Sequence, residues 1–417
     1  MARERNTEDA QDLFGRGHKA LSAGEYQEAV DCFSRAIRLR PDVSAGYRYR
    51  AYAYLELGDR IRALNDLDQA IRLKPDDVQA YADRAAELYA QKAYDQAVAD
   101  CDRVLKLDPG RVPLQALRGQ SHAARGDTEN ALADFAAAIA GDPENAPRYL
   151  LWRARLHLDC ENLATAESDA SAAIQLNPAE PEGFFVRGTV LQQRNNSSEA
   201  ITDFSESLRL APDHGLAHLG RAVCHFTLKE YAKAVADCSA AIRLLPGIVR
   251  AYELRGSAHK YLGDLDAAEA DFNEAIRLAP ASVMVYNYRA GVHYARKNYA
   301  AAVRDHMEAL KRDPRHAGTF NQLGWVWATC PEPDVRNGQR AKECGTRACE
   351  LTEWAEPGYL DTLAAACAEC GEFDDAVQWQ EKAISLVSTP EREADYRSRL
   401  ELYQQRKPAR AVGGIVD

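Results

Sequence analysis

Histidine is the residue type whose recurrence most readily suggests chemistry in this chain, because an imidazole titrates near neutral pH and serves as an acid, a base or a metal ligand. Five histidines recur at separations of 34 or 35 residues or twice that: His122, His157, His225, His259 and His293. A residue that returns at one repeat position serves every repeat rather than one active site. We therefore expect these rings to pack inside the structure with hydrogen-bonded tips. No serine or cysteine recurs with histidine and a carboxylate as a triad requires, so we predict no catalytic residue.

Cysteines gather toward the end of the chain. Cys367 and Cys370 have the spacing of a zinc-ligand pair, and Cys344 with Cys349 could complete a set of four. Both pairs also have helical spacing, so we expect small buried apolar thiols and predict no metal and no cofactor. A metal or redox site is the alternative. Ten cysteines in 417 residues are too few for a disulfide scaffold, which indicates free thiols in a reducing compartment.

Arginine and aspartate form the most regular pattern, with sixteen residues from one to the other. The arginines are Arg16, Arg50, Arg84, Arg118, Arg153, Arg187, Arg221, Arg255 and Arg289. The aspartates are Asp66, Asp100, Asp134, Asp169, Asp203, Asp237, Asp271 and Asp305. An arginine at a recurrent packing position needs a partner, because an unpaired buried charge is costly. We predict a ladder of Arg–Asp pairs, and the alternative is a row of arginines that binds anions.

Prolines show which elements position these residues. They recur every 34 residues, with one step of 35: Pro41, Pro75, Pro109, Pro143, Pro178, Pro212, Pro246, Pro280 and Pro314. An alanine precedes each proline by twelve residues and a small residue precedes most by five, which lets two helices approach closely before the proline ends the second. This pattern predicts that each repeat consists of a helix, a short turn and a second helix. In the second unit we expect helices at 44–57 and 61–73 around Gly58.

These phased residues resemble the tetratricopeptide repeat (TPR) family over roughly residues 10–386. The resemblance implies an all-α fold, a right-handed superhelix or α-solenoid of about eleven helix-turn-helix repeats with a C-terminal capping helix. First helices would line a concave groove and second helices would face outward. In the family's frame the arginines stand at position 7, which is usually leucine, and the aspartates at position 23.

Departures from the repeat set the expected domain boundaries. The predicted segments are a polar tail at 1–9, nine regular repeats at 10–316, two divergent repeats at 317–389 with an inserted loop at 330–338, a capping helix at 390–406 and a tail at 407–417. Thr389 suits the N-cap of the capping helix and Pro390 its first turn. Tyr396, Leu400 and Tyr403 form its apolar stripe.

The stretch from about 321 to 408 resembles a terminal TPR segment of large bacterial multidomain proteins, some of which carry kinase or caspase-like protease domains. It contains the runs Leu-Gly-Trp-Val-Trp-Ala-Thr-Cys-Pro and Gly-Tyr-Leu-Asp-Thr-Leu-Ala-Ala-Ala. The resemblance suggests a bacterial source. It transfers no catalytic activity, because such a domain is absent from this sequence.

The groove is where the resemblance places partner binding, at positions 2, 5, 6, 9, 12 and 13 of the first helices. The candidates are Phe14, Arg48, Tyr49, Tyr52, Tyr89, Trp152, Arg155, Phe185, Phe226, Lys260, Tyr261, Tyr288, Tyr294 and Trp325. Large aromatic side chains there suggest anchors for an extended peptide or partner helix, with arginines to orient it. The alternative is that several of them pack between neighbouring repeats.

The lysine and asparagine clamp of the chaperone-associated TPR subfamily is absent. Its five positions hold Phe14, His18, Tyr49, Gln79 and Asp83. Binding of a chaperone tail through that clamp is therefore not expected.

The net charge of -11 argues against a nucleic-acid partner, since phosphate neutralisation needs a basic face. No window approaches the roughly 18 apolar residues of a membrane span, and we predict a cytoplasmic protein without membrane or nucleic-acid partners. The function predicted is a non-catalytic protein–protein interaction scaffold or adaptor that binds a peptide or partner domain in the groove. The alternative is a regulatory or inhibitory subunit of a separate effector enzyme, a protease or a kinase. We predict that the chain is not itself an enzyme.

Overall fold

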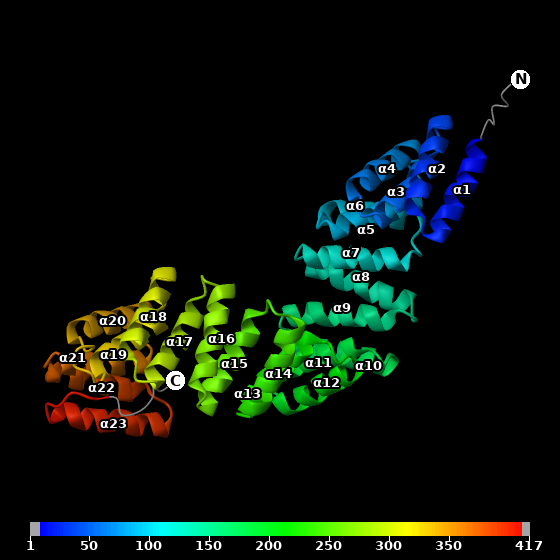
Figure 1. The fold of residues 1–417 in the computed structure, drawn as a ribbon. Coiled ribbons are helices and arrows are strands. Elements are labelled where there is room, and N and C mark those ends of the chain that lie inside the picture. The colour runs from blue at the N-terminus through cyan, green and yellow to red at the C-terminus, as the bar shows by residue number, and fades with distance from the viewer. Residues whose placement is uncertain (1–8, 411–417) are drawn as a thin grey trace, which may run out of the picture. The chain divides into compact units, whose positions relative to one another are not determined.

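The fold is entirely helical in the computed structural model, which describes residues 9–410 (Figure 1). This part of the chain contains 23 α-helices. Contacts divide the chain into two compact units, Met1–Asn195 and Asn196–Asp417. The predicted all-α stack of helix-turn-helix repeats with a capping helix is confirmed. The predicted tails fall largely on residues 1–8 and 411–417, which lie outside the described residues.

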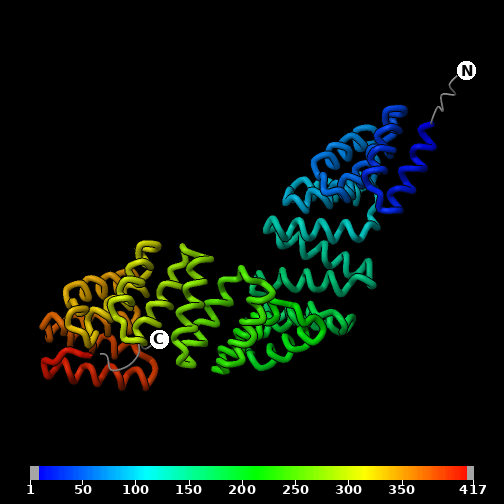
Figure 2. Tube along the Cα trace, in the orientation of Figure 1, coloured from blue at the N-terminus to red at the C-terminus, as the bar shows by residue number. Residues whose placement is uncertain are grey.

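Within each unit, successive helices form antiparallel pairs, most of them joined by short turns (Figure 2). The helices of the first unit are α1 (Ala10–Ala23), α2 (Tyr26–Leu39), α3 (Ser44–Glu56), α4 (Arg60–Leu73), α5 (Val78–Ala90), α6 (Tyr94–Leu107), α7 (Val112–Ala124), α8 (Thr128–Gly141), α9 (Ala146–Asp159), α10 (Leu163–Leu176) and α11 (Pro181–Gln193). Those of the second are α12 (Ser197–Leu210), α13 (Gly215–Thr227), α14 (Tyr231–Leu244), α15 (Val249–Leu262), α16 (Leu265–Leu278), α17 (Val283–Ala295), α18 (Tyr299–Arg312), α19 (Ala317–Thr329), α20 (Gly338–Leu351), α21 (Pro357–Glu369), α22 (Phe373–Leu386) and α23 (Pro390–Gln404). Among the described residues, every helix falls short of the length and apolarity that a membrane span requires.

The short turns inside the pairs contain a left-handed residue after the first helix, with the longer connection between α19 and α20 as the exception. Gly58 has φ 79° and Gly263 has φ 83° there. Lys229 and Lys297 adopt the same conformation at the equivalent position, with φ of 60° each. A side chain in this conformation costs roughly 1 kcal/mol, which the packing of the two helices offsets.

The predicted Arg–Asp ladder is confirmed for seven pairs whose two partners lie in one unit. Nε and Nη2 of Arg289 donate to the two carboxylate oxygens of Asp305 at 2.8 and 2.6 Å. The other pairs are Arg50–Asp66, Arg84–Asp100, Arg118–Asp134, Arg153–Asp169, Arg221–Asp237 and Arg255–Asp271. All seven aspartates are buried. Because each of these guanidinium groups has a buried counter-charge, they do not form the free row that anion binding would need.

A third contact, which the spacing did not predict, joins most of these arginines to the preceding repeat, but not Arg153, where the alanines Ala136 and Ala137 stand at the equivalent place. Nη1 of Arg84 donates to Asp68 at 2.6 Å, and Nη1 of Arg255 donates to Ser239 at 3.0 Å. The further contacts of this kind are Arg50 with Ser34, Arg118 with Asp102, Arg187 with Ser171, Arg221 with Ser205 and Arg289 with Asn273. Each of these arginines therefore extends from its first helix to a polar side chain on the preceding second helix. We call the three-residue set of arginine, aspartate and this polar residue a rung.

The capping helix α23 covers the last repeat through buried tyrosines and one ion pair with a buried aspartate. Tyr396 and Tyr403 are buried, and Arg399 Nε donates to Asp361 on α21 at 2.7 Å. Gln380 on α22 donates to both Asp361 and the carbonyl of Tyr396. The end of the stack is thus closed by apolar burial together with a hydrogen-bonded charge pair.

Removing both partners of a rung should cost less than the two single removals added together. We expect Arg255→Leu to lower the free energy of unfolding by about 3 kcal/mol, because it leaves Asp271 buried and unpaired. Arg255→Leu combined with Asp271→Leu should lose less than the sum of the single changes, with a coupling of about 1–3 kcal/mol. Urea denaturation followed by circular dichroism measures all three.

The matched control is Arg277→Leu, whose partner Glu274 lies on the same helix in an exposed ion pair. It should change the urea midpoint little. Strictly additive losses at Arg255 and Asp271 would show that the rung is not a coupled interaction.

Candidate functional site

First helices of four successive repeats in the second unit line a cavity of about 520 Å³. We call it the inner cavity. Its lining residues come from α13, α15, α17 and α19, from His316 in the loop before α19, and from one side chain of α16. They include four of the predicted groove residues, namely Phe226, Lys260, Tyr261 and Tyr288. This volume lies in the usual range of ligand sites, which is about 300–1,000 Å³.

The lining follows the repeat positions expected for the groove. In α15 it consists of Arg250, Glu253, Leu254, Ser257, Lys260 and Tyr261, which stand at positions 2, 5, 6, 9, 12 and 13. In α17 the lining residues Met284, Asn287, Tyr288 and Gly291 stand at positions 2, 5, 6 and 9. Selecting large aromatic and basic residues overlooked the polar and small members of this set. The signal that could have found Asn287, Ser257 and Gln322 was their position, not their size.

An aromatic cluster forms one wall of the inner cavity. The rings of Tyr231 and Tyr261 stack with centroids 4.8 Å apart, and Phe226 meets both edge-on at 5.3 and 5.7 Å. Tyr261 remains 49% exposed. The ammonium group of Lys260 lies 5.9 Å from the Tyr261 ring centroid. The wall therefore combines an accessible apolar ring face with a positive charge.

A buried hydrogen-bond network orients the polar side of the inner cavity. His306 Nδ1 lies 2.9 Å from Asn287 Oδ1, Asn287 Nδ2 donates to Thr319 Oγ1 at 2.7 Å, and Thr319 Oγ1 lies 2.8 Å from His316 Nδ1. His316 Nδ1 also accepts from the backbone N–H of Thr319 at 3.1 Å. These bonds have one consistent direction, with the Nδ1–H of His306 donating first and the bare Nδ1 of His316 accepting last. Both cavity-lining members, Asn287 and His316, are thereby held in single orientations.

A second hollow, the terminal pocket, has a volume of about 280 Å³ and is lined by α19, α21 and α23. It shares Gly318 and Gln322 with the inner cavity. The ion pair of buried Asp361 with half-buried Arg399 and the ring of Trp325 form part of its wall, with the Arg399 guanidinium 5.5 Å from that ring. Burial is the main cause that raises the pKa of Asp361 above its ordinary value, against the opposing effect of Arg399.

Two lining atoms of the terminal pocket lack a hydrogen-bond partner among the described residues. They are Oδ1 of Asn321 and Oε1 of Gln322, both buried. A buried acceptor without a donor costs roughly 1–3 kcal/mol. Because both oxygens are buried, a ligand in the pocket reaches them only after the two amide side chains turn toward it.

The comparison with family models decides which family this architecture represents. The tetratricopeptide repeat model matches residues 14–60, 50–112, 117–181, 185–247 and 254–317, which together cover more than half of the chain. The chain belongs to the tetratricopeptide repeat family. TPR folds commonly mediate protein–protein interaction, and the family is generally non-catalytic.

Among solved structures the chain is similar to yeast Tom70, with 17% identity over 95% of this chain and 96% of that chain and a TM-score of 0.43. It is also similar to a chain of the Cut9–Hcn1 hetero-tetramer of APC/C, with 14% identity, 96% coverage of both chains and a TM-score of 0.48. PilF of Pseudomonas aeruginosa is 22% identical over 52% of this chain and 99% of that chain, with a TM-score of 0.47. No match was found among curated proteins.

Some predicted groove residues of the first compact unit pack against neighbouring side chains. Tyr49 lies between His18 and Phe33, with ring centroids 4.1 and 5.7 Å away, and Phe14 lies 5.9 Å from Phe33. The guanidinium of Arg48 stands 4.5 Å from the Tyr49 centroid. These side chains hold the first two repeats together.

Other candidates of the first unit differ in exposure. Tyr52 is 47% exposed, whereas Tyr89 packs 5.6 Å from Tyr94. Trp152 and Arg155 line a hollow of about 260 Å³ beside the 35-residue step, where Arg155 forms an ion pair with Glu182. Phe185 packs against the core cluster of Leu150, Leu151 and Val186.

Tyr294 lies in the core rather than on an accessible surface. It is 5% exposed and packs 5.1 Å from Tyr299. Val335 from the inserted loop at 330–338 packs against the same cluster, and burial raises the pKa of Tyr294 to about 12. We therefore leave Tyr294 out of the proposed binding surface.

The recurrent histidines pack beside the rungs, and four of them contact carboxylates. His293 Nε2 lies 3.4 Å from Asp305, and His225 Nδ1 lies 2.6 Å from Glu230. His122 and His259 face Asp127 and Asp264 at 3.2 and 3.8 Å. Burial lowers the pKa of His157 and His293 below the ordinary value. The expected hydrogen-bonded ring tip is present at His225, whereas Nδ1 of His122 is buried without a hydrogen-bond partner among the described residues.

The C-terminal cysteines are free thiols, mostly buried. Cys344, Cys349 and Cys367 are buried, and burial raises the pKa of each to about 12. Thiols with such a raised pKa are poor nucleophiles at neutral pH. Within residues 9–410, no three histidine, cysteine or acidic side chains are grouped so as to hold a metal ion.

Acid should destabilise the network under the inner cavity. Complete burial lowers the pKa of His306 to about 3, whereas an unfolded histidine titrates near 6.5. Between these values only the unfolded state binds the proton, so stability is full above pH ~6.5 and falls as pH decreases, by up to about 1.4 kcal/mol per unit. At pH 5 this amounts to about 2 kcal/mol.

Denaturation of the wild type and of His306→Gln at pH 7.5 and pH 5 measures this contribution. The glutamine variant should lose about 2 kcal/mol less between the two values than the wild type does. Equal losses in the two proteins would show that His306 is protonated within the folded state.

Proposed function

We propose that this TPR protein is a non-catalytic interaction scaffold that binds an extended peptide segment of a partner protein along the inner cavity and the terminal pocket. One observation carries the proposal: the two hollows share Gly318 and Gln322 and are lined largely at repeat positions that packing leaves free. An extended chain provides side chains at regular intervals and backbone N–H groups between them. The aromatic rings of the lining suit such side chains, and its amide oxygens suit such N–H groups.

The chemistry of the lining specifies how the peptide would lie. An apolar or aromatic side chain of the peptide fits beside Tyr261, whose half-exposed ring belongs to a preformed cluster. Backbone N–H groups of the peptide would donate to the unpartnered oxygens of Asn321 and Gln322. Because the network through Asn287 is already oriented, little side-chain ordering remains to oppose binding.

The first-unit candidates Tyr52, Trp152 and Arg155 stay a separate prediction, and so do the cytoplasmic location and the bacterial source. The alternative of a regulatory subunit of an effector enzyme also stays a prediction. That alternative differs from the proposal in which protein is the partner, and it does not change the binding surface.

Partner binding should depend on the inner cavity and the terminal pocket together. We expect Tyr261→Ala combined with Gln322→Ala to weaken a co-purifying protein partner at least tenfold, since a central aromatic anchor and a hydrogen-bond acceptor are both lost. Affinity purification with mass spectrometry identifies the partner. Isothermal titration of the purified pair then gives the dissociation constants.

Leu386→Ala is the matched control, because Leu386 is an exposed apolar residue at the end of a second helix, 44% exposed. It should leave the affinity unchanged. If the double variant binds every wild-type partner with wild-type affinity, the inner cavity is not the recognition site.

A further inference from the structure

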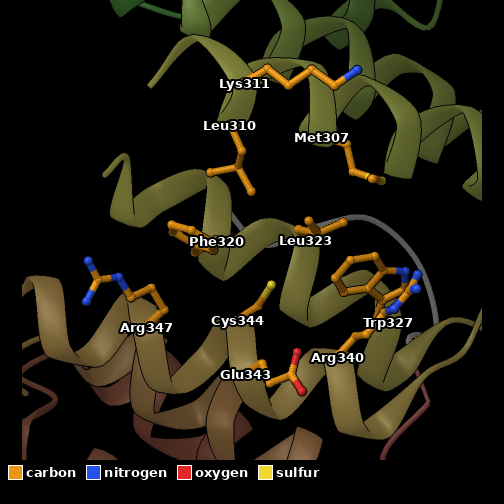
Figure 3. A pocket seen from close by; sticks show the side chains of 10 residues that line it. All are labelled: Met307, Leu310, Lys311, Phe320, Leu323, Trp327, Arg340, Glu343, Cys344 and Arg347. Atoms are coloured by element: carbon orange, nitrogen blue, oxygen red, sulfur yellow. The ribbon is translucent and has the colours of Figure 1, made fainter. Parts of the chain in front are cut away.

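Helix α19 also lines a third hollow, on the face opposite the inner cavity and the terminal pocket. Gly318 and Gln322 line the inner cavity and Trp325 the terminal pocket, whereas Phe320, Leu323 and Trp327 line a groove of about 620 Å³. At 100° per residue the two sets point in opposite directions from the helix axis. Figure 3 shows this outer groove, with α18 side chains along one wall, α20 side chains along the other and α19 as the floor.

The outer groove begins where the ladder of rungs ends. The last complete rung consists of Asn273, Arg289 and Asp305. The residues that occupy its three positions one repeat later are Met307, Leu323 and Cys344, where Cys344 is shifted by the five extra residues of the loop before α20. All three line the outer groove. An apolar triad thus replaces a charged one.

This replacement explains the open volume. In a rung the arginine extends from the first helix to side chains of the second helices on both sides. Leucine has no polar group that could bond both walls, and Leu323 is 1% exposed at the base of the groove, in one core cluster with Cys344 of α20. The connection between α19 and α20 spans 330–337, compared with 296–298 between α17 and α18. Met307 is left 43% exposed on the α18 wall.

Positive charges stand on both walls of the outer groove. Lys311 lies on the α18 wall, and Arg340 and Arg347 lie on the α20 wall, against one acidic lining residue, Glu343. The guanidinium of Arg340 is 5.7 Å from the Trp327 ring, and it has no carboxylate partner among the residues that the structure describes.

Two of these cations already have weak partners. Lys311 pairs with Glu308 and Arg347 with Glu350, each three residues away on the same helix and solvent-exposed. Exposed pairs of this kind contribute little and exchange readily for a better-placed carboxylate.

We propose that the outer groove binds an amphipathic α-helix of a partner protein, with an apolar stripe that enters the groove and acidic residues on both sides of the stripe. Phe320 and Trp327 are seven residues apart on α19, so the floor extends about 10 Å at 1.5 Å per residue. Two turns of a bound helix have this length, which corresponds to anchors at i, i+3 or i+4 and i+7. The acidic flanks meet Lys311 on one wall and Arg340 and Arg347 on the other.

This surface is independent of the proposed peptide site, because it uses the opposite face of α19 and the second helices α18 and α20. A scaffold with both surfaces holds two partners at once. One partner occupies the first-helix side, and the other occupies the outer groove.

The test uses the full chain and a display library of 14-residue helical peptides, with a randomised apolar stripe and Glu, Gln or Lys at the flanking positions. We expect enrichment of glutamate on both flanks. Fluorescence polarisation of an enriched peptide should show at least tenfold weaker binding to Met307→Glu, and weaker, less salt-sensitive binding to Arg340→Glu. Both substituted residues are exposed, so the fold is retained.

Met284→Glu is the matched control, since Met284 is 42% exposed and lines the inner cavity instead. It should bind the enriched peptide like the wild type while weakening the inner-cavity partner, which keeps the two proposals separately testable. The outer-groove proposal fails if no helical peptide is enriched, if lysine-flanked peptides are selected, or if Met307→Glu and Met284→Glu bind alike. It also fails if ultracentrifugation shows self-association that Met307→Glu abolishes, because the occupant is then a second copy of this chain.

Discussion

The bidentate pair of a repeat arginine with the aspartate sixteen residues later is the interaction on which the rest of the structure depends. It places a guanidinium at a helix interface that TPR proteins usually fill with leucine, and a buried charge is tolerated there only if its partner is always present. Arg255 and Asp271 show the geometry, with Nη2 and Oδ1 2.6 Å apart. Because a third bond reaches Ser239 in the preceding repeat, the same guanidinium also couples neighbouring repeats.

The rungs use one face of each first helix and leave the other free. In α15 all six groove positions, beginning with Arg250 and ending with Tyr261, line the inner cavity. Where the rung is replaced by Met307, Leu323 and Cys344, the interface between second helices is no longer filled, and the outer groove opens. Both candidate binding surfaces thus follow from the presence or absence of the same interaction.

Sequence reasoning reached the fold and the pairing, and it was less complete at the site. The positions that line the inner cavity were predicted, but choosing among them by size overlooked Asn287 and Gln322, which supply oriented or unpartnered polar groups. Size also selected Tyr294, which the inserted loop and Tyr299 bury. The free polar atoms and the covered ring depend on neighbouring elements that the spacing within one repeat does not describe.

The sequence by itself determined the period, the helix pairs and the Arg–Asp partner within each repeat, because a fixed separation along a helical hairpin brings the same two positions together every time. Only the tertiary structure decided which side chains of different repeats meet. The third bond that most of the arginines form, the depth of the inner cavity and the opening of the outer groove all depend on the packing of helices from consecutive repeats. That packing depends on the shapes of side chains tens of residues apart, so one substitution such as leucine at position 323 changes a surface without changing the period.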